Sequence, residues 1–276
     1  MHPESTDRRR RFAEEARSAR PDLATLCLLV GAEADPALGE AGLDAAQAEL
    51  DRLAGLLPFG ITGARAWATA LADLLGARYG FHGSSTDYQR LESSLLPEVL
   101  RRRRGLPILL SVVWIEVARR AGAPVYGVAL PGHFVVGFGD PAERVLADPF
   151  AAGRMLTGQD AELLVTGTTG APATPDLFTP ADPLTVVLRI LNNIRAWAAT
   201  RPERMDVSLW AVELSLLLPS HPARLRYDRA QLLVQRGNFL SGAAEMDAYA
   251  EVVAAVEPST AEAIRRKARA ARAMLN

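Results

Sequence analysis

The stretch that decides the fold is GLPILLSVVWIEVARRAG, residues 105–122. Pro107 suits the first turn of a helix, where its missing backbone N–H costs nothing. The residues that follow, 108–115, are apolar on nearly every side of a helix, and a helix without a polar face is a buried one. The stretch therefore predicts a buried central helix from Pro107 to about Arg120.

Short runs typical of β-strands follow this helix at 125–130, 133–138 and 144–147, separated by turns that contain Pro and Gly. They predict a small antiparallel sheet packed on the buried helix. On the N-terminal side, apolar residues recur at helical spacing, which predicts helices at 22–57 (two), 64–79 and from about 91 to 104. The predicted fold class is therefore α+β, with helices before and after the sheet.

The chain divides into four predicted segments. Residues 1–21 are polar and charged and are expected to be a flexible N-terminus, and 22–166 form the α+β domain. Residues 167–183 are rich in Pro, Gly and Thr and predict a linker. Residues 184–276 predict successive helices at 184–200, 207–218, 224–235 and 240–257. Their short turns favour a tetratricopeptide-like stack, and a plain helical bundle is the alternative.

Composition excludes several classes of function. The formal net charge is −1, so we expect no nucleic-acid partner and no membrane-surface partner. The four arginines at 101–104 are interpreted as a solvated helix end rather than a phosphate site. The single cysteine, Cys27, cannot form an internal disulfide, and no Cys/His spacing indicates a metal, so neither metal nor cofactor is expected. With no apolar run of about 20 residues and no secretory-type start, a cytoplasmic location is expected.

Two residues predict a site for chemistry. His133 begins one strand run and Asp148 ends the next, and both follow the buried helix. Cysteine hydrolases and acyl transferases need a thiolate at a helix N-terminus, a histidine beside it and a carboxylate that orients the histidine. The order of helix, His strand and Asp strand can bring such groups together, but the nucleophile is missing. Ser111 is a weak replacement, because a serine inside a helix usually bonds to the carbonyl four residues back. Cys27 belongs to an apolar stripe and is interpreted as a small core residue.

The motifs resemble those of the SirB-type bacterial family. They are VLRRRRGLPI at 99–108, Ala121-Gly122, PGHF at 131–134 and DPF at 148–150, with LNNIR at 191–195, Asp228-Arg229 and RGNF at 236–239 in the helical tail. The resemblance covers most of 22–257 and implies a papain/transglutaminase-like core followed by a tetratricopeptide-like tail.

The resemblance also identifies the position of the missing nucleophile. In active transglutaminase-like enzymes the catalytic cysteine follows a glycine by two positions at the head of the core helix, and that place here is Pro107. The implied site is therefore Pro107, His133 and Asp148, without a nucleophile. The chain departs from the SirB-type pattern at Leu109, where serine is common, and at Ser93, where asparagine is expected.

Two functions follow from these residues. The favoured one is a pseudoenzyme that binds protein or peptide through its helical tail. The alternative is a hydrolase or acyl transferase in which His133, paired with Asp148, acts as a base on an amide or ester. The SirB-type resemblance also carries an association with control of gene expression, but no DNA-reading element is present. Substrate, partner and oligomeric state are not predicted.

Overall fold

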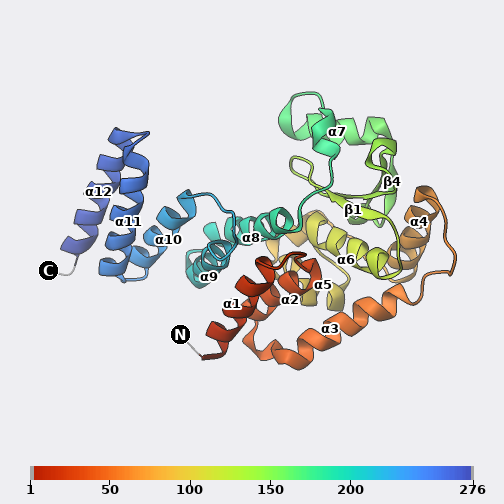
Figure 1. Ribbon diagram of the computed structural model, residues 1–276, viewed down its shortest axis with the longest axis horizontal. Coiled ribbons are helices and arrows are strands. Elements are labelled where there is room, and N and C mark those ends of the chain that lie inside the picture. The colour runs from red at the N-terminus through yellow and green to blue at the C-terminus, as the bar shows by residue number, and fades with distance from the viewer. Residues whose placement is uncertain (1–2, 275–276) are drawn as a thin grey trace.

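The predicted central helix is α6 (Pro107–Arg120) in the computed structural model, which describes residues 3–274. Every residue from Pro107 to Ala118 is buried, as the apolar pattern requires. Trp114 is fully buried, and the ring of Phe81 meets it edge-on with 6.1 Å between centroids. Figure 1 shows α6 between the sheet on one side and helices of the N-terminal half on the other.

The sheet has four antiparallel strands in chain order: β1 (Val125–Val128), β2 (Val135–Phe138), β3 (Val145–Asp148) and β4 (Arg154–Leu156). Side chains alternate between its faces. Val136 and Ala147, which are paired across β2 and β3, join the core around α6. Val135 and Leu146 join a second apolar cluster, which α7 (Gly158–Thr169) covers. The α+β class is confirmed. Strand β4 and helix α7 are not predicted by the sequence pattern.

The helices before the sheet are α1 (Pro3–Ala16), α2 (Leu23–Ala34), α3 (Gly39–Ala54), α4 (Ala64–Leu71), which continues into a π-helical segment (Ala72–Arg78), and α5 (Leu96–Arg102). The prediction of a flexible N-terminus at 1–21 is wrong for the described part, while residues 1 and 2 lie outside the described residues. Phe12 and Ala16 of α1 are fully buried in the main core, and Arg9 pairs with Glu33 and Glu213 at 2.5 and 2.7 Å.

The predicted linker and domain boundary need correction. The predicted linker spans 167–183, but α7 continues to Thr169 and Phe178 is buried against the sheet. α8 (Pro183–Ala199) and α9 (Met205–Ser215) bury Ile190 and Trp210 in the same core as α6. A boundary at 184 would therefore cut through one apolar core.

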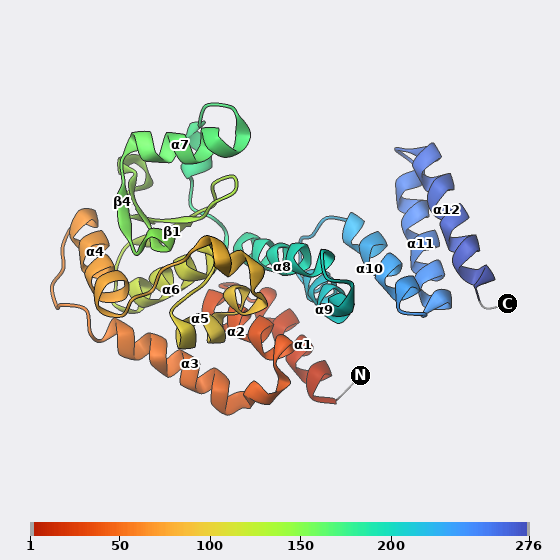
Figure 2. The ribbon, with the colours of Figure 1, turned by 180° about the vertical axis from the view of Figure 1, so that it is seen from behind.

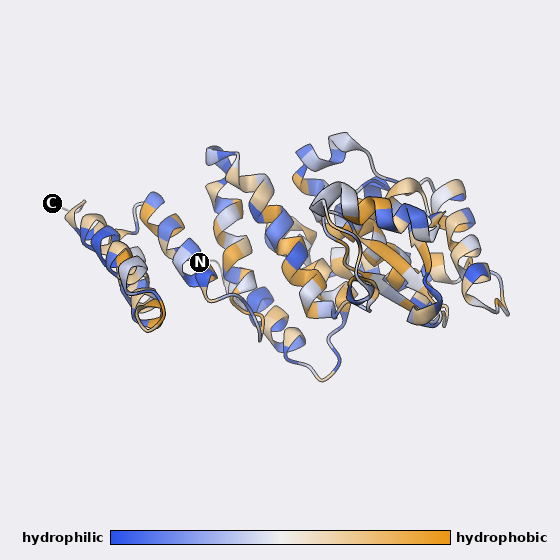
Figure 3. Cartoon of the chain, turned by 90° about the horizontal axis from the view of Figure 1, so that it is seen from above, coloured by the Kyte–Doolittle hydropathy of each residue, from blue (hydrophilic) through white to orange (hydrophobic). Residues whose placement is uncertain are grey.

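The last three described helices are α10 (Arg224–Gln235), α11 (Phe239–Ala254) and α12 (Pro258–Ala273). They share an apolar cluster of their own and project from the rest of the molecule (Figures 1 and 2). Figure 3 shows the hydrophobic strands enclosed at one end and these helices standing apart at the other. We call residues 3–218 the body and residues 224–274 the tail. Within both, every helix is too short or too polar to span a lipid bilayer.

Candidate functional site

The structure brings His133 and Asp148 together at one end of the sheet. His133 follows a turn in which its N–H donates to the carbonyl of Leu130, just before β2, and Asp148 is the last residue of β3. Because β2 and β3 are paired, the two side chains lie side by side, with 3.0 Å between His133 Nε2 and Asp148 Oδ1. Both side chains are nearly buried, at 12% and 7% exposure.

The two atoms lie close together but do not form an aligned hydrogen bond. His133 Nε2 is buried and has no hydrogen-bond partner within residues 3–274, so Asp148 Oδ1 lies off the direction of the ring N–H. Oδ1 instead accepts a hydrogen bond of 2.9 Å from the N–H of Phe150, which caps the short turn after β3. The carboxylate is thereby fixed by the backbone.

Two aromatic side chains form a wall beside this pair. The ring of Phe150 lies edge-on to His133 and edge-on to Tyr88, with centroid separations of 6.0 and 6.1 Å. Burial raises the pKa of Tyr88, the nearby charge of Asp148 raises it further, and Arg189 opposes both. The phenol, the carboxylate and the guanidinium therefore share one environment.

The backbone at Gly83 packs so closely against Phe150 that only a glycine fits at this position. Its N–H donates to the carbonyl of Phe150 at 3.0 Å, and a Cβ at this position would lie 2.0 Å from the Phe150 ring. Any other residue would displace the aromatic wall. The sequence contains this signal in GFHG at 80–83, but it points to Phe150 only once the two segments are seen in contact.

Arg189 of α8 holds the His133 turn from the other side. Its Nη2 donates to the carbonyls of Leu130 and His133 at 2.8 and 2.7 Å, and its guanidinium lies 5.7 Å from the centre of the Phe134 ring. Burial lowers the pKa of Arg189, and the Tyr88 phenol opposes this. Sequence reasoning missed this residue, although an arginine among the buried positions of α8 is a usable signal.

The head of α6 offers no nucleophile, and Ser111 is not placed to replace one. Pro107 is buried in the first turn of α6, directly after the N-cap residue Leu106. Ser111 is fully buried and its hydroxyl donates to the carbonyl of Phe134 at 3.3 Å. The expectation that Ser111 bonds within its own helix is wrong, because the segment entering β2 supplies the acceptor.

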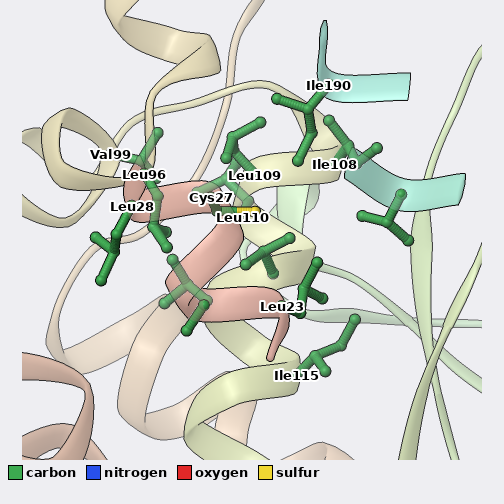
Figure 4. Packing of buried hydrophobic residues seen from close by; sticks show 14 of the residues in the cluster. Leu23, Cys27, Leu28, Leu96, Val99, Ile108, Leu109, Leu110, Ile115 and Ile190 are labelled. Carbon is green, nitrogen blue, oxygen red and sulfur yellow. The ribbon is translucent and has the colours of Figure 1, made fainter. Parts of the chain in front are cut away.

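Cys27 lies in the apolar core, as predicted. It is 2% exposed, and Figure 4 shows its sulfur among leucines that include Leu109 and Leu110 of α6. Burial raises the pKa of the thiol well above its usual value, and the charges of Glu116 and Asp22 raise it further. A thiol kept protonated in this way is a poor nucleophile.

The arginine run at 101–104 is partly structural. Asp87 is 2% exposed, and its carboxylate faces Arg104 at 3.0 Å and Arg102 at 3.6 Å. Arg101 pairs with Glu98 on the same helix, and Arg103 lies over the Tyr79 ring at 5.2 Å. The prediction of a wholly solvated helix end is therefore wrong for two of the four.

In residues 3–274, no group of three or more His, Cys, Asp or Glu side chains is placed to hold a metal ion.

Comparison with known proteins agrees with the two parts of the predicted architecture. Residues 42–192, more than half of the chain, match the family model "Transglutaminase-like superfamily", and residues 194–276 match "Tetratricopeptide repeat". The predicted core and tail types are thus confirmed. Neither description carries the SirB-type name. The repeat match begins within α8, so the first matched helices belong structurally to the body.

Relatives are found in bacteria and in animals. A UPF0162 protein of Xylella fastidiosa is 33% identical over 166 residues, which are 58% of this chain and 59% of that protein. A UPF0162 protein of Haemophilus influenzae is 24% identical over 184 residues, 66% of this chain and 68% of that protein. F-box only protein 21 of Mus musculus is 28% identical over 162 residues, 56% of this chain and 24% of that protein. The alignment to the Xylella relative thus leaves about two fifths of that protein unmatched.

Proposed function

The chain belongs to the transglutaminase-like superfamily, and we propose that it is a non-catalytic member that binds a protein or peptide. One observation carries the proposal: α6 begins at Pro107, where the SirB-type resemblance places the nucleophile, and proline has no ionisable or nucleophilic group. Two residues could substitute for the nucleophile, but neither is free to do so. The Ser111 hydroxyl donates to the carbonyl of Phe134, and the Cys27 side chain is buried in the apolar core. A proline at this place also fits the SirB-type resemblance.

The tail supports the binding half of the proposal. Tetratricopeptide repeats commonly mediate protein interactions, and stacked helical repeats present extended surfaces for them. Of the eight large apolar side chains that are exposed within the described chain, four lie in the tail, which is about a fifth of its length. They are Leu240, Val252, Val256 and Met274. These exposed apolar side chains are available to contact a partner.

A segment similar to the core also occurs in a protein that extends well beyond it, as expected of a binding module. The match to F-box only protein 21 occupies about a quarter of that protein, so there the similar segment is joined to other parts. In the Xylella relative the matched segment is a larger share. This pattern supports a unit that holds its own fold and is combined with different neighbours.

The first test is catalytic. The purified whole chain is incubated with a panel of glutamine peptides with an amine acceptor, simple amides and nitrophenyl esters. We expect no turnover above buffer and no change on His133→Ala. Turnover that His133→Ala abolishes would overturn the non-catalytic proposal.

The second test concerns binding. Peptides are selected on the immobilised whole chain from a random library, and their affinities are measured by calorimetry. We expect Val252→Glu combined with Val256→Glu to weaken the selected peptides at least about tenfold, because charges at apolar contacts oppose docking. Leu163→Glu is the matched control, since Leu163 is a 63% exposed leucine on α7 of the body. Peptides unaffected by the tail variant, or equally weakened by the control, would contradict binding through the tail.

One observation favours the alternative function, a hydrolase or acyl transferase with His133 as base. The imidazole and the carboxylate of Asp148 remain 3.0 Å apart although the nucleophile is absent. Such a pair can accept a proton from a water molecule while the oxygen of that water attacks the carbonyl carbon of an amide or ester. Under this alternative, His133→Ala and Asp148→Asn would each reduce turnover at least about a hundredfold. Equal background rates in both variants and the unmodified chain would exclude it.

A further inference from the structure

A cavity of about 260 Å³ lies between residues 85–94 and helix α8, beside the head of α6. Its walls include Tyr88, Arg90, Ser94, Leu106, Asn193 and Trp197. Tyr88 also contacts Phe150, which lies against His133, so the cavity adjoins the His–Asp pair without containing it. Leu106 immediately precedes Pro107, so the cavity opens next to the place where a nucleophile would be.

Two polar groups in the cavity have no protein partner. Ser94 is only 2% exposed, and its hydroxyl makes no hydrogen bond to any part of the chain between residues 3 and 274. The carboxamide of Asn193 is half-buried and likewise unpaired within that range. Neither group is among the fully enclosed side-chain atoms that lack a partner, so both keep contact with solvent and can bond to something that enters the cavity.

The charge of the cavity favours an anion. Arg90 is exposed and its guanidinium forms no ion pair among residues 3–274, whereas no Asp or Glu is part of the lining. Its neighbour Arg201 is fixed in place, 4.4 Å from the centre of the Trp197 ring and hydrogen-bonded to Gln89 Oε1 at 3.1 Å. An unpaired arginine with hydroxyl and amide donors around it matches a carboxylate, which accepts several hydrogen bonds at once.

The remaining walls are flat and apolar. The indole N–H of Trp197 donates to the carbonyl of Gln89 at 3.0 Å, which holds the ring against the segment that carries Arg90. Leu106 closes the end near α6. A short aliphatic stem fits between these walls while its acidic end reaches Arg90 and Ser94.

We propose that this cavity binds a carboxylate on a short aliphatic stem, as on an acidic side chain of a peptide. The proposal rests on the proposed binding function for the source of the carboxylate. The preference for a carboxylate over its neutral amide comes from the cavity alone, and can be measured without any peptide partner.

The experiment uses the whole chain labelled with ¹⁵N and follows the indole N–H signal of Trp197, assigned by its loss in Trp197→Phe. Three probes are titrated: glutamate blocked at both ends, glutamine blocked in the same way, and acetyl-alanine with a free terminal carboxylate. We expect a saturable shift with blocked glutamate and binding at least about tenfold weaker for blocked glutamine, which lacks the charge. Saturation by acetyl-alanine alone would assign the cavity to a chain terminus, contradicting the side-chain source.

Variants test which residues hold the carboxylate. Arg90→Gln is expected to weaken blocked glutamate about tenfold, and Ser94→Ala several-fold. Arg236→Gln is the matched control, because Arg236 is also exposed and its side chain has no partner within residues 3–274, but it lies in the tail. Equal shifts with glutamate and glutamine, or equal loss in Arg90→Gln and Arg236→Gln, would overturn the proposal.

The outcome is separable from that of the proposed function. If blocked glutamate binds as expected and the peptide library yields nothing, carboxylate binding in the cavity is supported and the proposed peptide binding is contradicted. If peptides bind through the tail and no blocked residue shifts Trp197, the cavity assignment fails and the binding module stands.

Discussion

The body and the tail are both built from packed helices, but they fill their interiors with side chains of different size. The largest fully buried side chains of the body include Trp114, Phe12, Phe134 and Phe138. In the apolar cluster of the tail, six of the nine buried residues are alanine, and the others are Tyr227, Met246 and Ile264. One region encloses large side chains, and the other brings helix backbones close together.

This difference predicts unequal stability. Burying one methylene-sized group contributes about 0.8 kcal/mol, whereas a leucine or phenylalanine side chain contributes about 1.5–3 kcal/mol. The tail therefore has less apolar burial per residue to offset its conformational entropy. It is the region expected to open first, while the body holds His133 and Asp148 in fixed positions.

Charged side chains cross the boundary between the two regions. Glu213 of α9 pairs with Arg9 of α1 at 2.7 Å and with Arg229 of α10 at 3.4 Å. Arg229 also pairs with Glu245 of α11 at 2.9 Å. Burial raises the pKa of Glu245, and Arg229 opposes this. The N-terminal helix is thus connected through α9 to the first helices of the tail, although it lies at the other end of the sequence.

The largest effect should come from Phe12→Ala. The Phe12 side chain has no solvent exposure and packs in the main core, so its removal leaves a cavity beside α2. We expect the free energy of unfolding of the body to fall by about 3–5 kcal/mol, measured by urea denaturation. Arg10→Ala on the solvent face of the same helix is the control and should leave the midpoint unchanged. An unchanged midpoint in Phe12→Ala would show that α1 contributes nothing to the body.

The parts of the body that could be predicted from sequence are those with local signals. The central helix was predictable because its first residues are apolar on every side, and His133 and Asp148 because each lies at a strand end. The proposed position of the nucleophile at Pro107 rests on the resemblance and not on spacing. These signals need no knowledge of which distant segments meet.

The parts that could not be predicted depend on distant contacts. Among residues 6–16 of α1, only Phe12 and Ala16 are buried apolar residues, so its sequence looks disordered until Glu33 and Glu213 are seen opposite Arg9. Strand β4 has only three residues. The role of Arg189 arises because α8 packs on the turn before β2, which lies 56 residues earlier in the chain at His133.

An intermediate effect is expected from Asp87→Asn, which tests whether the body depends on a buried charge as well as on large side chains. Burial raises the pKa of Asp87, but hydrogen bonds from Arg104 and Ser84 outweigh burial, so the pKa lies below the ordinary value of 3.8. Replacing the carboxylate leaves Arg104 and Arg102 without their acidic partner. We expect the body to lose about 2–3 kcal/mol near neutral pH, measured by urea denaturation.

The loss of stability in Asp87→Asn should depend on pH. Because the folded pKa of Asp87 is lower than the unfolded one, its contribution is complete above about pH 4 and is lost as the pH falls through the folded value. The difference between Asp87→Asn and the unmodified chain should therefore shrink below about pH 4. Asp44→Asn, an exposed aspartate of α3, should leave the profile unchanged. A difference that stays constant down to about pH 2 would show that the charge is not responsible.

The smallest effect, and the sharpest test of the comparison, is Gly242→Ala in the tail. A Cβ at Gly242 of α11 would lie 2.6 Å from Val234 Cγ2 and 2.7 Å from the carbonyl oxygen of Ala230, so α10 and α11 would have to separate. We expect the tail to lose about 1–3 kcal/mol, seen as faster amide hydrogen exchange in 224–274 with unchanged exchange in the body.

The same substitution in the body provides the control. A Cβ at Gly167 of α7 would meet no neighbouring atom within 4 Å, so Gly167→Ala should stabilise its helix by about 0.5–1 kcal/mol and slow its exchange. The opposite signs follow from one cause, because alanine improves a helix wherever its methyl group has room. If Gly242→Ala instead accelerated exchange in body and tail together, the two regions would unfold as one unit, and the small side chains inside the tail would not set its stability apart.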